Sequence, residues 1–339
     1  MPLQSYGILK GKAVDKIMAS SSNEHFQILV NADGTSYRIA INVKSQVSPP
    51  EVLFYMDHDY HHEITDAIKA ANLNAGYTHL QSAPGTLAVD FIRRNMFDIQ
   101  ELKPIPYNIP GADNDINEKL DFYVTQAINE ADAVVYAWGD KWGPETAADQ
   151  YFHFKPGNGI HDIHMNQGND GSYKKDNGVW QDGALMIYFP SREQWVAVFI
   201  AFQVQTFHTD DQTGNPIAAT PPGPGPIPVE QETPIRIIAA MVNPEGDDVG
   251  KESIILLNKS NQDIDLTGWS IVDKNVNHDT ITAKTIPGAD TLKITLTGRG
   301  AQLGNKGGTI TLLNAEGLKI AGVSYTESDA DVQDELVEF

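Results

Sequence analysis

The alternation of apolar and polar residues predicts an N-terminal region that combines strands with a few helices. Alternating runs typical of half-buried strands cover Ser5–Val14, His25–Asn31, Ser36–Val43, Ala133–Trp138, Ala184–Phe189 and Trp195–Thr206. Helical spacing of apolar residues predicts helices over Glu63–Ala71, Leu87–Asn95 and Ile116–Ala131. Turn residues at 32–35 and 190–194 join neighbouring strand runs as hairpins. Residues 1–219 are therefore expected to form an α+β domain with a mostly antiparallel sheet.

A proline-rich segment marks the end of this domain. Residues 220–228 contain five prolines in nine positions, and repeated proline fixes φ and removes backbone donors. We expect residues 220–233 to be a semi-rigid linker.

The pattern after the linker is all-β. Short strand runs separated by polar turns cover Ser253–Asn258, Trp269–Asp273, Leu292–Leu296 and Thr309–Asn314. Within residues 234–326, the elements Asn243-Pro244-Glu245-Gly246, Leu257-Asn258-Lys259-Ser260 and Asp265-Leu266-Thr267-Gly268-Trp269 occur in order. In this order they resemble the lamin tail domain. The resemblance implies an immunoglobulin-like sandwich and a targeting or protein-binding role without catalysis. The residues themselves predict a turn at Asp265 and Gly268 and place Trp269 in the core.

Composition and charge exclude several classes of site and partner. The chain of 339 residues has no cysteine and a net charge of −21, so disulfides, thiolate ligands and cysteine nucleophiles are ruled out. The negative charge opposes nonspecific adsorption to long nucleic acids or anionic lipid. No apolar run reaches the ~18 residues of a membrane helix. The N-terminus has no secretory signal pattern, so we expect a cytoplasmic protein without membrane insertion, with non-Sec export left open. Residues 327–339 are acidic and without a basic side chain, which predicts a mobile tail.

The most polar segment of the first domain is 156–169. On a strand, Asp162, His164 and Asn166 share one face, while His161 and Gln167 lie on the other. Asp162 would fix the tautomer of His164, and an imidazole so placed suits general acid or base catalysis near neutral pH. On a helix, His161 and His164 would instead share a face and bind a metal.

Two further polar sets accompany this segment. Gln203 and Gln205 lie on one face at the end of an apolar strand, where they brace the core or line a cavity, and His208 follows the strand end. The strand Ser36–Val43 places Arg38, Asn42 and Lys44 opposite its apolar positions. These polar side chains form either an anion-binding surface or an ordinary solvated face. The histidine-rich run Met56–Glu63 is interpreted as a helix start rather than a metal site.

Several of these segments together resemble the bacterial YukJ-like family, a domain of unknown function. The matching residues are Tyr6-Gly7-Ile8-Leu9-Lys10-Gly11, 37–45, 157–169, Asp182-Gly183-Ala184 and Ala201-Phe202-Gln203. This resemblance implies a common domain over residues 1–219 and brings no activity with it.

The side chains leave three functions open. The first is a hydrolase, a phosphodiesterase or nuclease acting on nucleotides or short nucleic acid. In it His164, with Asp162, His161 and His208, provides acid–base catalysis, and Arg38, Asn42, Lys44, Asn166, Gln167, Gln203 and Gln205 bind substrate. This hypothesis requires no cofactor. The second is a metal hydrolase that holds a divalent ion through His161, His164 and His208 with a carboxylate. The third is a noncatalytic binding or scaffold protein with a structural polar pocket.

Overall fold

The computed structural model describes residues 3–45, 52–91, 94–98, 101–109, 111, 114–161, 180–202, 234–246, 248–315, 317 and 319–339. The chain divides into two compact units, Met1–Gly111 with Ala127–Glu230 and Ala112–Gln126 with Gln231–Phe339. The predicted linker 220–233 lies outside the described residues. The second unit therefore includes a segment, 112–126, that the sequence assigns to the first domain.

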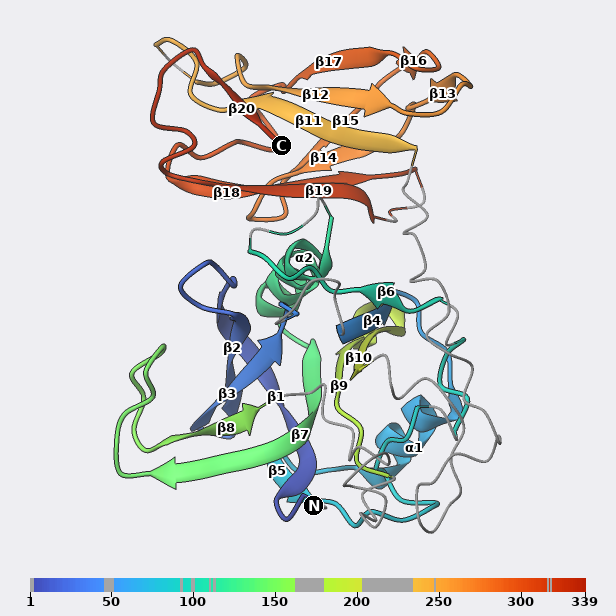
Figure 1. The fold of residues 1–339 in the computed structure, drawn as a ribbon, viewed down its shortest axis with the longest axis vertical. Coiled ribbons are helices and arrows are strands. Elements are labelled where there is room, and N and C mark those ends of the chain that lie inside the picture. Colours follow the sequence, from blue (N-terminus) through green and yellow to red (C-terminus); the bar gives the residue numbers. More distant parts are fainter. Residues whose placement is uncertain are drawn as a thin grey trace. The chain divides into compact units, whose positions relative to one another are not determined.

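The first unit is built on a strand ring that closes on itself (Figure 1). Its members, in ring order, are β1 (Tyr6–Ile17), β2 (His25–Ala32), β3 (Thr35–Asn42), β8 (Gly157–His161) and β7 (Val134–Glu145). β7 pairs back onto β1 and completes a barrel. β3 and β8 are parallel, and the other neighbours in the ring are antiparallel. The sheet is thus mixed, with one parallel pair, and it is mostly antiparallel as predicted.

Turn chemistry and register explain how the ring forms. Asp33 and Gly34 both have positive φ between β2 and β3, as a two-residue hairpin turn requires. The register places Phe26 opposite Ile41, and Ile28 opposite Ile39. All four side chains are buried, so one face of the hairpin contributes to the barrel core.

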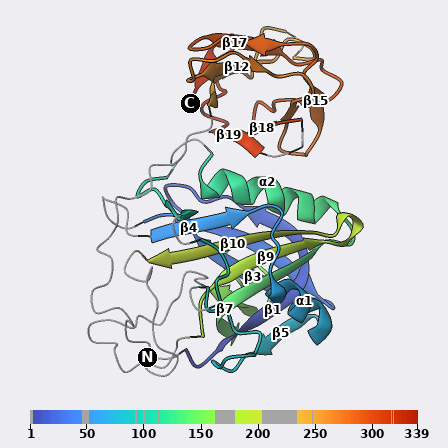
Figure 2. The same ribbon diagram turned by 90° about the vertical axis from the view of Figure 1, so that its right-hand side faces the viewer.

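Further strands extend the sheet beyond the ring. They are β9 (Ala184–Phe189), β10 (Gln194–Phe202), β4 (Val52–Asp57) and β6 (Lys103–Pro104) on one side, and β5 (Gly76–His79) beside β1. A short 3₁₀ turn, Pro190–Arg192, joins β9 to β10, and Figure 2 shows β4 running beside β10. Helix α1 (Glu63–Ala71) contributes Ile64 and Ile68 to an apolar cluster with Trp138 and Phe199. Helix α2 spans Ile116–Asn129.

The predicted helix over Leu87–Asn95 is wrong, because its described residues form turns and irregular backbone. The Val89 amide donates to the Tyr6 hydroxyl at 3.2 Å, and the Phe91 amide donates to the Asp182 carboxylate at 2.9 Å. A helix would have bonded the Phe91 amide to the Leu87 carbonyl, and this amide is satisfied by a long-range partner instead. Tertiary contacts therefore override the local apolar spacing.

The C-terminal part of the second unit is all-β. One sheet contains β17 (Thr291–Thr295), β12 (Ser253–Asn258), β11 (Ile235–Met241) and β20 (Leu336–Glu338). Another contains β15 (His278–Thr280), β14 (Ser270–Val272), β18 (Gly307–Leu313) and β19 (Lys319–Thr326), and β13 (Ile264–Asp265) pairs with β16 (Thr285–Ile286). Ile254, Ile271 and Ile310 come from different strands of these sheets and join one buried cluster. A single core therefore holds the sheets together.

The motif residues of this unit form its turns. Asp265 accepts hydrogen bonds from the Thr267 amide and hydroxyl, and Gly268 has a φ of 84°. Fully buried Asn258 donates to the carbonyl oxygens of Gln262 and Pro287. Trp269 is half-buried and packs against the core cluster. The predicted turn at 265–268 is confirmed.

The predicted mobile tail is wrong. Residues 336–338 form β20, which pairs with β11 from Ala239 to Met241. Val337 and Ala330 are buried. Charge alone predicted mobility, but an apolar residue between exposed neighbours at 336–338 is enough to add an edge strand.

Glu252 makes the stability of this unit depend on pH. Its side chain is buried, and only one carboxylate oxygen is hydrogen-bonded, to the Leu303 amide at 2.9 Å. Burial, together with Asp248, Asp273 and Asp279, raises the pKa of Glu252 to about 7. Because the folded pKa exceeds the unfolded value, ionisation destabilises the fold, and stability falls as pH rises from about 4.5 to 7.

We expect Glu252→Gln to remove most of this pH dependence. The variant should melt at a higher temperature than the parent protein at pH 8, and the difference should shrink at pH 5. Calorimetry at both pH values measures this, with Glu245→Gln, an exposed carboxylate in the same unit, as the control. An equal melting temperature of Glu252→Gln and the parent protein at pH 8 would show that ionised Glu252 does not destabilise the fold.

Candidate functional site

The polar candidate site lies on the outer face of the barrel. Arg38 and Ala40 of β3 pair with Gly159 and His161 of β8. On the other side of β8, Gly159 pairs with Trp142 of β7. On the other side of β3, Ala40 pairs with Gln27 of β2. Since side chains alternate along a strand, these residues all project to the face opposite the apolar barrel core.

Arg38 is the centre of this face. Its Nε donates to Asp149 Oδ2 at 2.6 Å and its Nη1 donates to Gln27 Oε1 at 2.7 Å. Its guanidinium carbon lies 4.6 Å from the Trp142 ring centroid and 4.8 Å from that of Tyr151. Arg38 is only 9% exposed. The guanidinium therefore contacts two aromatic rings and is paired with a buried carboxylate.

Asp149 comes from the loop between β7 and β8. Besides Arg38, it accepts hydrogen bonds from the Tyr151 and Phe152 amides at 3.0 and 2.9 Å. Burial acts to raise the pKa of Asp149, but the bonds from Arg38 and from the two amides outweigh it and hold the pKa below its ordinary value. Asp149 therefore stays ionised, and its negative charge neutralises the positive charge of Arg38.

A hydrogen-bond chain connects this loop to the loop between β1 and β2. The Tyr151 hydroxyl donates to Asn23 Oδ1 at 3.0 Å, and Gln27 Nε2 donates to the same oxygen at 3.1 Å. Gln27 in turn accepts from Arg38. Two loops and two strands are thus fixed to one another by buried polar contacts.

Two imidazoles extend the row of rings. The His25 and His161 ring centroids lie 5.2 Å apart, and the His161 ring meets the Trp142 ring edge-on at 6.0 Å. His161 is exposed and His25 is half-buried. Trp142 lies across Gly159, where a Cβ would collide with both the Trp142 ring and the Arg38 carbonyl oxygen. Glycine at 159 is therefore required for this arrangement.

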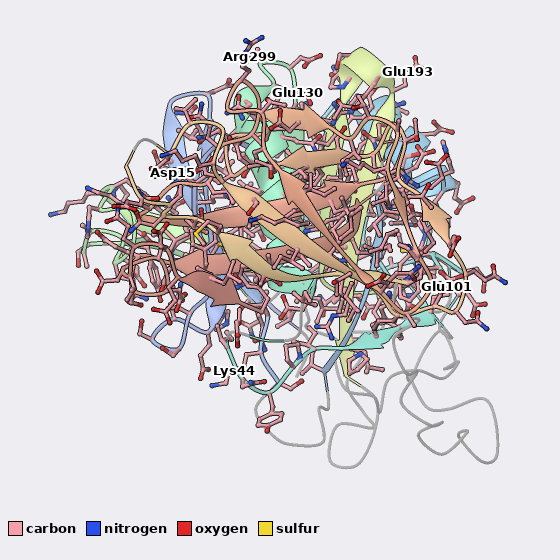
Figure 3. The ribbon with its side chains drawn as sticks, turned by 90° about the horizontal axis from the view of Figure 1, so that it is seen from above. Asp15, Lys44, Glu101, Glu130, Glu193 and Arg299 are labelled. Carbon is pink, nitrogen blue, oxygen red and sulfur yellow. The ribbon has the colours of Figure 1, made fainter. Side chains whose placement is uncertain are left out.

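Two other predicted substrate-binding residues lie at the end of the same hairpin. Lys44, labelled in Figure 3, donates to Glu24 Oε1 at 2.7 Å, and this bond lowers the pKa of Glu24. Asn42 Oδ1 accepts from the Lys44 amide at 3.1 Å. Asn42 pairs with His25 across the hairpin, so it stands beside the imidazole pair. The structure thus brings Arg38, Asn42 and His161 to one face, whereas Lys44 is engaged by Glu24.

The remaining predicted site residues lie outside the described residues. They are Asp162, His164, Asn166, Gln167, Gln203, Gln205 and His208. His161 is the last described residue before the 162–169 segment. The roles assigned to His164 and His208 stay predictions.

Metal-binding geometry is absent from the part of the chain that the structure describes, where no three His, Asp or Glu side chains form a metal-holding group. The histidine run 58–62 has another role, as predicted. His62 is the N-cap of α1, and its Nδ1 accepts from the Ile64 amide at 3.1 Å. The metal set His161, His164 and His208 is not tested, because two of its members are not described.

Sequence reasoning missed His25, Trp142, Asp149 and Tyr151. His25 and His161 are 136 positions apart, and only the register of β2, β3 and β8 brings them together. Asp149 is one of many acidic residues and gives no local signal. The glycines of 157–159 were the available clue, because glycine in a strand often marks a close approach of another group.

None of the described helices is both long and apolar enough to cross a membrane.

Comparison with known proteins matches both parts of the chain. Residues 228–327 match the Lamin Tail Domain, as the sequence predicts. The "Uncharacterized protein YukJ" of Bacillus subtilis (strain 168) is 43% identical over 221 residues, covering 64% of this chain and 96% of that protein. Residues 1–214 match the uncharacterized conserved protein family DUF2278. The chain therefore belongs to the DUF2278 family and carries a lamin tail domain after it.

Proposed function

We propose that the N-terminal domain hydrolyses phosphodiester bonds in nucleotides or short nucleic acid at the outer barrel face. The observation that carries this proposal is the His25–His161 pair, with ring centroids 5.2 Å apart. Histidine is the usual general acid and base near neutral pH. Two imidazoles at this separation can exchange protons with the attacking and the leaving oxygen of one phosphate group.

The reaction follows from these positions. One neutral imidazole accepts a proton from the attacking water or ribose hydroxyl as the new P–O bond forms. The other imidazole, protonated, donates its proton to the leaving oxygen as the old P–O bond breaks. The predicted residue His164, with Asp162, lies three positions beyond His161 in the chain and would supply a further acid–base group. No metal ion is needed for either transfer.

The test is a substrate panel. Bis(p-nitrophenyl) phosphate, 2′,3′-cyclic and 3′,5′-cyclic nucleotides and short oligonucleotides are incubated with the full chain, in EDTA and in Mg²⁺, Mn²⁺ or Zn²⁺. We expect turnover that persists in EDTA. Loss of turnover in EDTA with recovery in a divalent metal would favour the metal hydrolase instead.

A second candidate function is binding without catalysis on the same face. It is favoured by Arg38, whose charge is neutralised by Asp149 and whose side chain is buried. A buried, paired guanidinium is a poor stabiliser of transition-state charge. Binding of nucleotides with no turnover under any metal condition would support this function over hydrolysis.

For the C-terminal domain we infer an immunoglobulin-like sandwich with a protein-binding role. Two antiparallel sheets that share one apolar cluster support the sandwich. The motif residues Asp265 and Asn258 are used in turns, so they are not available for catalysis. We expect Glu252→Gln, a change within this domain, to leave phosphodiester turnover unchanged.

A further inference from the structure

The outer barrel face carries a continuous row of flat groups. In order they are His25, His161, Trp142, Arg38 and Tyr151, and each contacts the next. We call this set the stacking row. His25, Trp142 and Tyr151 are half-buried, and His161 is exposed. Aromatic rings that stay partly open on a strand face are surfaces on which planar ligands stack.

The row is also rigid. The bonds from Tyr151 to Asn23 and from Arg38 to Asp149 and Gln27 fix the surrounding loops. A platform whose surrounding loops are already fixed by hydrogen bonds loses little conformational entropy when a ligand binds.

Strand order gives independent support. The ring β1-β2-β3-β8-β7, with β3 and β8 parallel and α2 between β3 and β7 in the chain, has the order of a closed oligonucleotide/oligosaccharide-binding barrel. In such barrels ligands lie on the face of the second and third strands, between the loops after the first and the fourth strand. Here that face holds Gln27 and Arg38, and those loops hold Asn23 and Asp149.

We propose that the stacking row binds a few unpaired bases of a short single-stranded nucleic acid. The proposal rests on the proposed function, because it names the substrate class of the same site. In a duplex the bases stack on one another, so they cannot stack on Trp142 or Tyr151. The chain carries a net charge of −21, so stacking rather than phosphate contact must supply the affinity. Log affinity against log salt should then have a slope shallower than about −2, since each neutralised phosphate adds about −0.7.

The experiment is fluorescence anisotropy with a 5′-fluorescein 12-mer and with the same strand in a 12-base-pair duplex. It is run on the full chain at 4 °C in EDTA, and the length of the strand is checked after each titration. We expect the single strand to bind at least about tenfold more tightly than the duplex. Trp142→Leu should weaken single-strand binding at least about tenfold, whereas Trp142→Phe should retain most of it. Tyr77→Leu is the matched control. Tyr77 of β5 is a half-buried aromatic residue that does not belong to the row, and its ring centroid lies 4.9 Å from the Lys141 Nζ.

Equal affinity for both nucleic acids, or unchanged binding by a folded Trp142→Leu variant, would overturn the proposal. So would binding of a neutral oligosaccharide such as chitotetraose with no binding of the 12-mer. The outcomes separate this proposal from the proposed function. Strand binding without cleavage of any substrate supports the stacking row and refutes hydrolysis. Cleavage of cyclic nucleotides with no preference for single strands supports hydrolysis and refutes the stacking row.

Discussion

Replacement of His161 by alanine is expected to lower phosphodiester turnover by about 10²–10⁴-fold, the usual contribution of general acid–base catalysis. His25→Ala should have an effect of similar size, because each imidazole serves one of the two proton transfers. The double variant should lose little more than either single one, since residues that act as a unit are not additive. Initial rates with the best substrate of the panel measure this, and circular dichroism verifies the fold.

The control for the histidine variants is His61→Ala. His61 is exposed, with its imidazole 3.5 Å from the Asp59 carboxylate, and it lies in the histidine run before α1. Turnover of this variant should equal that of the parent protein. The predicted acid–base residue His164 is tested in the same way. If His164→Ala abolishes turnover while His25→Ala retains it, the catalytic centre lies in the 162–169 segment and not at the imidazole pair.

The second large effect is expected at Asp149. Asp149→Ala leaves the buried Arg38 guanidinium without its counter-charge, and breaking such a pair from one side costs about 3–5 kcal/mol. The loss should appear in the unfolding transition of the unit that contains the barrel, followed by urea denaturation. Because the folded pKa of Asp149 is depressed, its contribution to stability is present at neutral pH. This contribution is lost as the pH falls below the ordinary pKa of an aspartate side chain.

Two comparisons test the cause of that loss. Glu24→Gln breaks the Lys44–Glu24 pair, which is partly open to solvent, and should cost less than about 1 kcal/mol. Arg38→Met combined with Asp149→Leu removes both charges and should be less destabilising than Asp149→Ala alone. A double variant that is markedly less stable than Asp149→Ala would mean that the rings and Gln27 hold Arg38 without help from the ion pair.

Local signals predicted much of the fold. Helix α1 and strands β9 and β12 have the predicted bounds, because each is a well-separated periodic run. The hairpin of β2 and β3 follows from Asp33 and Gly34. Barrel closure could not be predicted from local patterns, because the β3–β8 and β1–β7 pairings join segments that are distant in the sequence. β5, β6 and β8 are short, and β8 is rich in glycine, so their residues carry little strand pattern.

The candidate site was predictable only in part. Alternation along β3 placed Arg38 and Asn42 on the polar face, and that face exists. The same pattern could not show that Arg38 is buried, because its cover comes from Asp149, Trp142 and Tyr151. Those residues belong to β7 and the loop after it. Long-range packing, which no local window contains, therefore decides whether a polar position is solvated or enclosed.

The strand β20 has a consequence for association between molecules. An open sheet edge offers unpaired amides and carbonyls to another chain, and proteins protect such edges with short strands and charges. β20 covers the edge of β11 with only three residues, and Asp334, Glu335 and Glu338 place carboxylates on and beside it. A second chain that tried to extend this sheet would meet like charge and a strand too short to template pairing. The acidic residues on and beside β20 thus disfavour edge-to-edge pairing of this sheet with another chain. Loss of the residues after 326 would uncover the longer, more apolar edge of β11.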